Sequence, residues 1–244
     1  MKYFVAGNWK THLTGSAASE LAGQVLSHCD ELGVAVFPPS LYAERVGQVL
    51  AGSSIGLGLQ DISEQGQGAT TGDICSEQAL DVGCQFVLVG HSERRQRQGE
   101  TNEWVAQKAL AAVQAGLTPV VCVGETLEQR ESGQQLAVVN AQLAPVLASL
   151  PAQASWMVAY EPVWAIGTGK TASAEQAQAM HNAIRAQLGE SNMQSTKILY
   201  GGSVKAANAE ELAECPDVDG ALVGGAALKI DEFAAIVAAF REKK

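Results

Sequence analysis

Residues 156 to 173 read WMVAYEPVWAIGTGKTAS, and this stretch contains the step from which a fold can be predicted. Its first four residues are all apolar, as is typical of a buried strand in a parallel sheet. Glu161 and Pro162 end that strand, two glycines follow, and residues 174–188 then have the apolar periodicity of a helix. A strand therefore leads through a polar connection into a helix.

The same step recurs along the whole chain. Short apolar runs begin on average about 31 residues apart, which is the size of one strand–helix–strand unit. These runs occupy residues 3–6, 34–37, 55–59, 86–89, 119–123, 156–159, 198–200 and 221–223. Helical periodicity fills the intervals, as at 102–115, and no linker interrupts the series. The pattern predicts an α/β protein in which residues 1–244 form a single-domain (β/α)8 barrel.

An open, doubly wound sheet is the alternative arrangement of such units. That fold usually carries a GxGxxG fingerprint after its first strand, whereas this chain has Gly7-Asn8-Trp9-Lys10 there. The closed barrel is therefore favoured.

Composition narrows the function classes. With 47% apolar and 17% charged residues, the 244-residue chain is expected to be a globular protein with a substantial core. A formal net charge of -10 argues against nucleic acid or an anionic membrane as a partner. The five cysteines have no metal-binding spacing and the N-terminus has no signal peptide, which together favour the cytoplasm.

Polar residues and glycines gather where the predicted strands end. All strands of a parallel barrel end on one face, which carries the active site in essentially every characterised case. These positions are Asn8 and Lys10; His91, Ser92 and Glu93; Glu161; Gly201, Gly202 and Ser203; and Gly224 and Gly225. Each of them alone is typical of a surface charge, a helix start or a turn. Their occurrence together on one face predicts a site.

The residue types indicate the chemistry of that site. Glycine pairs after the last two strands suit a phosphate group, because they let backbone N–H groups approach an anion. A carboxylate, a histidine at a helix start and a lysine suit proton abstraction beside a carbonyl, as base, electrophile and stabiliser of negative charge. The sequence contains no metal cluster or cofactor motif, so neither a metal nor a cofactor is expected.

The chain resembles the triosephosphate isomerase family from end to end. The resemblance rests on AGNWK at 6–10, GATTG at 68–72, VGHSERR at 89–95, CVGE at 122–125, YEPVWAIGTGKTA at 160–172, YGGSV at 200–204 and VGGAAL at 223–228. It implies a TIM barrel that interconverts dihydroxyacetone phosphate and glyceraldehyde 3-phosphate through an enediol, in glycolysis and gluconeogenesis.

The resemblance also implies a role for each matching residue. Glu161 matches the general base and His91 the neutral electrophile, assignments for which this family is itself a standard example. Asn8 and Lys10 match groups that hold substrate and offset its charge, and Glu93 matches the partner that orients the lysine. The phosphate ligands of the family correspond to Gly167, Ser203, Gly224 and Gly225.

Two loops complete the implied picture. Residues 162–172 resemble the lid that closes over the bound phosphate and excludes water. Residues 65–72 resemble the loop through which a homodimer forms. This chain has Thr11-His12 where many members of the family have Met-Asn, and Thr70 where the interface loop usually has an aromatic residue. We therefore expect a weaker dimer contact, with the catalytic groups intact.

Two other functions remain to be compared with this one. GTGKT at 167–171 is similar to the end of a nucleotide phosphate loop, but that motif requires glycine where Trp164 stands. The second alternative is a non-catalytic barrel that acts as a binding module. The presence of Lys10, His91 and Glu161 argues against it.

Overall fold

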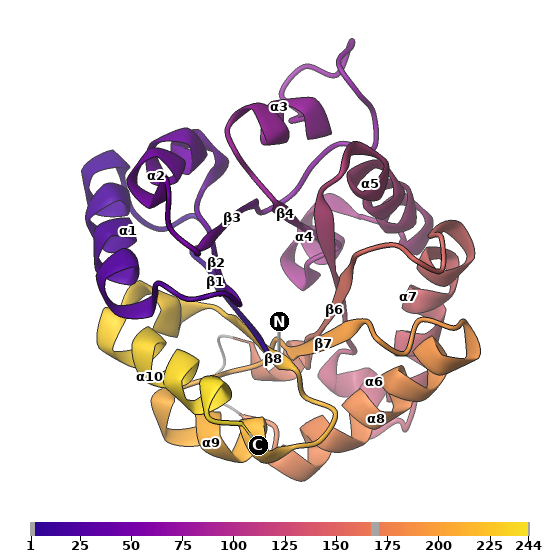
Figure 1. Ribbon diagram of the computed structural model, residues 1–244. Helices are drawn as coiled ribbons and strands as arrows, with labels where there is room; N and C mark the ends of the chain where they lie inside the picture. The colour runs from indigo at the N-terminus through magenta and orange to yellow at the C-terminus, as the bar shows by residue number, and fades with distance from the viewer. Residues whose placement is uncertain (1–2, 167–170, 244) are drawn as a thin grey trace.

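The computed structural model describes residues 3–166 and 171–243, and its centre is a closed barrel of eight parallel strands in chain order (Figure 1). The strands are β1 Phe4–Asn8, β2 Val34–Phe37, β3 Gly56–Leu59, β4 Phe86–Val89, β5 Thr118–Val123, β6 Met157–Tyr160, β7 Lys197–Tyr200 and β8 Gly220–Val223. β8 pairs with β1 to close the ring. The predicted (β/α)8 fold is confirmed, and the open-sheet alternative is wrong.

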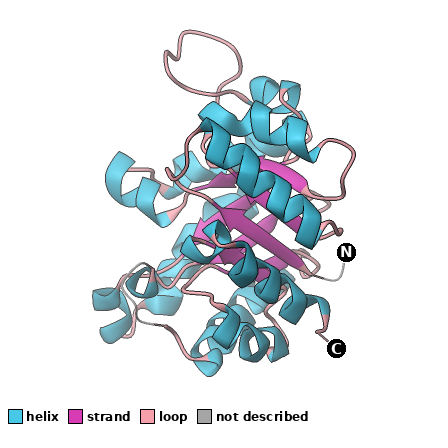
Figure 2. Cartoon of the chain, turned by 90° about the vertical axis from the view of Figure 1, so that its left-hand side faces the viewer, coloured by secondary structure: helices cyan, strands magenta, loops and turns pink. Residues whose placement is uncertain are grey.

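Helices surround the barrel and cover the outer face of its strands (Figures 1 and 2). The α-helices are α1 Gly15–Cys29, α2 Ala43–Leu50, α3 Ser76–Asp81, α4 Ser92–Gln98, α5 Asn102–Ala115, α6 Leu127–Glu131, α7 Gln135–Ser149, α8 Ala174–Glu190, α9 Ala206–Glu214 and α10 Ile230–Arg241. Single 3-10 turns are η1 Ser40–Tyr42, η2 Val163–Ala165 and η3 Gly225–Leu228. None of the helices in the described part of the chain is long and apolar enough to cross a bilayer.

Strand residues alternate between two packed layers. Phe4 and Ala6 belong to the cluster inside the barrel, and Val5 between them packs in the layer beneath the helices. Met157 and Ala159 likewise lie inside the barrel. Because successive side chains of a strand point to opposite faces, this alternation fixes which residue enters the barrel mouth at each strand end.

One segment departs from the compact body. The connection from β3 to α3 protrudes from the barrel and reaches the top of both views (Figures 1 and 2). It contains residues 65–72, which are exposed except for the half-buried Thr70. Leu41 is also 82% exposed.

Candidate active site

A cavity of about 610 Å³ opens at the carboxyl ends of the strands. Asn8 and Glu161 continue the inward alternation of β1 and β6 by two residues, and Gly201 and Gly224 do the same for β7 and β8. All four line this cavity, together with Lys10 and His91. These six expected residues are therefore brought together around one space. Ser92 and Glu93 do not line it, but Ser92 contacts Glu161 and Glu93 contacts Lys10.

Glu161 is a buried carboxylate held at both oxygens. Its Oε1 lies 2.9 Å from His91 Nε2, and its Oε2 accepts a hydrogen bond of 2.9 Å from the Ser92 backbone N–H. Only 2% of its side chain is exposed. Gly201 packs beside it, since a Cβ at that position would lie 2.9 Å from Glu161 Cγ. These two contacts hold the carboxylate at the cavity that it lines.

His91 is the N-cap residue of α4, and its ring is oriented by that helix. Its Nδ1 accepts a 3.2 Å hydrogen bond from the Glu93 backbone N–H. An imidazole nitrogen that accepts cannot carry a proton, so the proton of the neutral ring is on Nε2, which faces Glu161. The ring therefore presents an N–H donor to the cavity.

The two groups shift each other's titration. Burial raises the pKa of the Glu161 carboxyl, but His91 and the Ser92 N–H lower it by more, so the carboxylate stays ionised. Burial lowers the pKa of the His91 ring, while the adjacent Glu161 carboxylate raises it by more. The increase in the His91 pKa depends on the Glu161 contact. Without this contact, burial and the N-terminus of α4 favour the neutral ring.

Lys10 follows β1 in a left-handed backbone conformation, with φ 51°. Its backbone N–H donates to Asn8 Oδ1 at 3.0 Å, and its ammonium forms a short ion pair with Glu93. The lysine side chain is 24% exposed and lines the cavity. Asn8, Lys10 and Glu93 thus form one connected group at the mouth of the barrel.

Part of the cavity lining is suited to an anion. Ser203, Gly224 and Gly225 line it, and η3 begins at Gly225. The first N–H groups of a helical turn have no partner within the turn, so they are available to a bound anion. Gly167, the remaining expected phosphate ligand, and most of the GTGKT segment lie outside the described residues.

Several residues near the cavity were not singled out from the sequence. Leu222 lines it from β8, and Lys205 and Lys229 lie exposed at its rim. Lysines after strands carry no periodic signal, but both follow the glycine pairs that had been noted.

A buried carboxylate, Glu125, anchors the start of the segment that follows β6. Both of its oxygens accept from Tyr160 Oη, and Oε1 also accepts from the Trp164 indole N–H at 3.0 Å. Arg130 pairs with the same oxygen at 3.0 Å and lies over the Trp164 ring. Glu125 ends the CVGE segment of the sequence, where no role had been predicted for it.

Within residues 3–166 and 171–243, no group of three or more His, Cys, Asp or Glu side chains is arranged to hold a metal ion.

Comparison with known proteins gives one consistent result. A family model described as triosephosphate isomerase matches residues 3–240. A triosephosphate isomerase from Pseudomonas syringae pv. tomato is 54% identical over 241 residues, covering 95% of this chain and 96% of the relative. Those of Pseudomonas putida and Bordetella pertussis are each 52% identical over 241 residues, covering 95% and 96% of this chain and 96% of each relative.

Proposed function

The chain belongs to the triosephosphate isomerase family and interconverts dihydroxyacetone phosphate and glyceraldehyde 3-phosphate in glycolysis, and we propose that Glu161 is the base of this reaction. It removes a proton from the carbon beside the carbonyl and returns it to the neighbouring carbon. The observation that carries the proposal is the contact of a buried, ionised carboxylate with the ring of His91 at the mouth of the barrel. The nucleotide-binding and non-catalytic alternatives are set aside by the family assignment.

His91 and Lys10 act on the oxygens of the substrate in this proposal. His91 gives its Nε2 proton to the carbonyl oxygen as the carbon loses its proton, which forms a neutral enediol. Nε2 then takes a proton back from the second oxygen before the neighbouring carbon is reprotonated. Lys10, held by Glu93, offsets the negative charge that develops on the way. Asn8 positions the lysine by accepting its backbone N–H. Ser203, Gly224, Gly225 and Gly167 bind the phosphate.

The test of the base assignment is Glu161→Gln. An amide cannot accept the proton, and removal of a general base typically costs on the order of 10² to 10⁴-fold in rate. Glu175→Gln is the matched control, because Glu175 is an exposed residue in the first turn of α8. We expect Glu175→Gln to keep full turnover. Glu161→Gln should fold normally but lose most of its turnover. Near-native turnover in Glu161→Gln would exclude Glu161 as the base.

We also propose that the working form is a homodimer in the cytoplasm. It binds a small phosphorylated triose and neither nucleic acid nor a membrane. The protruding residues 65–72 and the exposed Leu41 support a contact between two copies (Figures 1 and 2). Thr11 and Thr70 offer little apolar surface to that contact, so the dimer should dissociate at comparatively high concentration. Across a dilution series, the dimer fraction measured by light scattering and the specific activity should fall together. A monomer with full activity at every concentration would refute this proposal.

A lid over the bound phosphate is the last part of the proposal. Its predicted tip is residues 165–169, of which 167–169 lie outside the described residues, so the support comes from its N-terminal anchor, Trp164 on Glu125. Closure would exclude water from the enediol, which can otherwise eliminate phosphate. Shortening residues 166–170 should increase methylglyoxal among the products, and an unchanged product mixture would contradict this role.

A further inference from the structure

The backbone of Lys10 has a conformation that needs support from its surroundings. A positive φ is uncommon outside glycine, and Lys10 has φ 51° immediately after β1. Its N–H is held by Asn8 and its ammonium by Glu93. Neither contact fixes the carbonyl end of the residue, which must also be held if the side chain is to keep its direction.

Gln60 provides that third contact. Its side-chain Nε2 donates at 2.7 Å to the Lys10 carbonyl oxygen and at 2.9 Å to the Phe37 carbonyl oxygen. Both N–H groups of the amide are thereby used on two backbone oxygens at the ends of β1 and β2. Gln60 itself follows β3 directly and is half-buried. One side chain therefore ties the ends of three adjacent strands at the position of Lys10.

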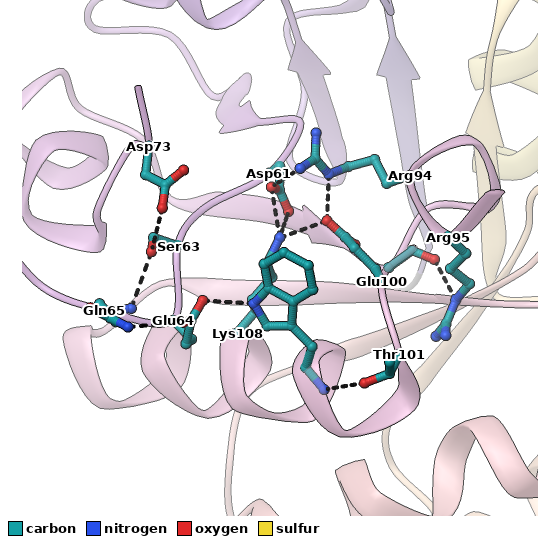
Figure 3. A network of polar contacts seen from close by, with 12 residues as sticks. Asp61, Ser63, Glu64, Gln65, Asp73, Arg94, Arg95, Glu100, Thr101 and Lys108 are labelled. Atoms are coloured by element: carbon teal, nitrogen blue, oxygen red, sulfur yellow. Dashed lines mark hydrogen bonds and ion pairs between the residues drawn. The ribbon is translucent and has the colours of Figure 1, made fainter. Parts of the chain in front are cut away.

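Asp61, the residue after Gln60, links the end of β3 to α4. Asp61 lies between the Arg94 guanidinium, at 2.7 Å, and the Lys108 ammonium, at 2.8 Å (Figure 3). Glu100 accepts from both of these cations, at 2.7 Å from Arg94 Nε and 2.6 Å from Lys108 Nζ. The Glu100 carboxylate is fully buried, and only 2% of the Lys108 side chain is exposed.

These contacts close a ring around Lys10. Its ammonium pairs with Glu93, which is followed in the chain by Arg94; Arg94 pairs with Asp61, which is preceded by Gln60. Gln60 then returns to the Lys10 carbonyl. The two ends of the lysine are thus held by α4 and by the end of β3, and the Asp61–Arg94 ion pair joins those two elements.

We propose that Gln60 is a positioning residue for catalysis, which acts by holding the Lys10 backbone so that the ammonium stays over the substrate oxygen. This inference rests on the proposed role of Lys10. A displacement of about 1 Å in a catalytic group can cost on the order of 10²-fold in rate, so loss of the amide should be felt in turnover rather than only in stability.

The decisive experiment is a double-mutant cycle of Gln60→Met and Lys10→Met. Methionine has nearly the length of glutamine but no donor for the two carbonyls. In the parent, Gln60→Met should lower kcat/KM by about 10- to 100-fold. In the Lys10→Met background it should lower kcat/KM by less than about 2-fold, because the group that it positions is gone.

Gln178→Met is the matched control. The Gln178 amide also makes two hydrogen bonds, donating to Asp217 Oδ2 and accepting from the Asp217 backbone N–H, but it does not line the cavity. It should lower the melting temperature with little effect on kcat/KM in either background. All variants are compared at one protein concentration at which light scattering shows the same oligomeric state as the parent.

Gln60→Glu gives a second readout. The isosteric carboxylate has no donor when ionised but one O–H when protonated, so kcat/KM of this variant relative to the parent should recover as pH falls through the carboxyl's pKa. The values of kcat/KM are compared only if the variant stays soluble. Its circular dichroism must also match that of the parent at the start and end of the titration. If Lys10→Met leaves too little activity to measure, the same cycle is read from calorimetric affinity for a phosphorylated enediolate analogue.

The outcomes separate the two hypotheses. Near-native activity in Lys10→Met would overturn the proposed role of Lys10 and with it the basis of this inference. A large loss in Lys10→Met with equal factors for Gln60→Met in both backgrounds would overturn the inference alone, because the glutamine would then act independently of the lysine. If Gln60→Met lowers kcat/KM only when Lys10 is present, the result supports the role of Gln60 as a positioning residue.

Discussion

His181 should make the stability of this enzyme fall in mild acid. The ring lies on α8, is fully buried, and packs against the rings of Tyr160 and Tyr200. Its Nδ1 lies 3.2 Å from the Asp217 carbonyl oxygen, so Nδ1–H donates there and Nε2 is bare. Nε2 is buried with no hydrogen-bond partner among the described residues. A proton on Nε2 would therefore be both charged and unpaired.

The magnitude follows from the pKa of this ring. Burial lowers it from 6.5 to about 4; the Asp217 carbonyl, Asp219 and Asp217 act in the opposite direction, while Arg185 assists the decrease. The unfolded chain then binds more protons than the folded one between these values, so stability is complete above pH 6.5 and is lost as pH falls. At 1.36 kcal/mol per pKa unit the loss is about 2 kcal/mol at pH 5 and about 3 kcal/mol near pH 4.

The assay is urea unfolding from pH 7.5 to pH 4.5, at fixed protein concentration, of the parent and of His181→Asn. Asparagine can keep a donor to the Asp217 carbonyl but does not titrate, so other acid-sensitive groups cancel in the difference. The parent should lose about 2 kcal/mol more than the variant between pH 7.5 and pH 5. Two curves that stay parallel within about 0.5 kcal/mol would refute the assignment of a neutral, buried ring.

Two further predictions concern the cavity. Gly201→Ala should lower kcat by about 10-fold or more with little loss of secondary structure, because the new Cβ would lie 2.9 Å from Glu161 Cγ and displace the base; unchanged kcat in a folded variant would contradict this. Lys205→Ala and Lys229→Ala together should lower kcat/KM at low salt and weaken its salt dependence, because two rim cations that attract the phosphate into an acidic protein are removed. A salt dependence equal to that of the parent would argue against their role in steering.

The barrel could be predicted from the sequence because each strand is a local, apolar signal. The expected runs at 34–37 and 86–89 coincide with β2 and β4, and the helix expected at 102–115 coincides with α5. β1 extends to Asn8, beyond the predicted end at residue 6, because ladder pairing with β2 continues through Gly7 and Asn8 after the apolar run stops. Hydrogen bonding between strands, which no single segment encodes, sets such ends.

The candidate site was predictable in its residues but not in its supports. Asn8, Glu161 and the glycines stand at strand ends, where topology alone brings them together. Gln60 was not foreseen, because a single amide after a strand has no periodic signal and its partners are backbone carbonyls. His181 occupies a core position of α8 between Met180 and Ile184, but only the folded structure reveals that its Nε2 has no partner.

The most direct test of the central claim is to follow hydrogen at the reacting carbons in deuterium oxide. If Glu161 removes a carbon proton and exchanges it with solvent before returning it, glyceraldehyde 3-phosphate formed from dihydroxyacetone phosphate should carry deuterium at carbon 2. Glu161→Gln should incorporate deuterium more slowly than the parent by on the order of 10² to 10⁴-fold, whereas Glu175→Gln should match the parent. Deuterium incorporation by Glu161→Gln at the parent's rate would contradict proton transfer by Glu161.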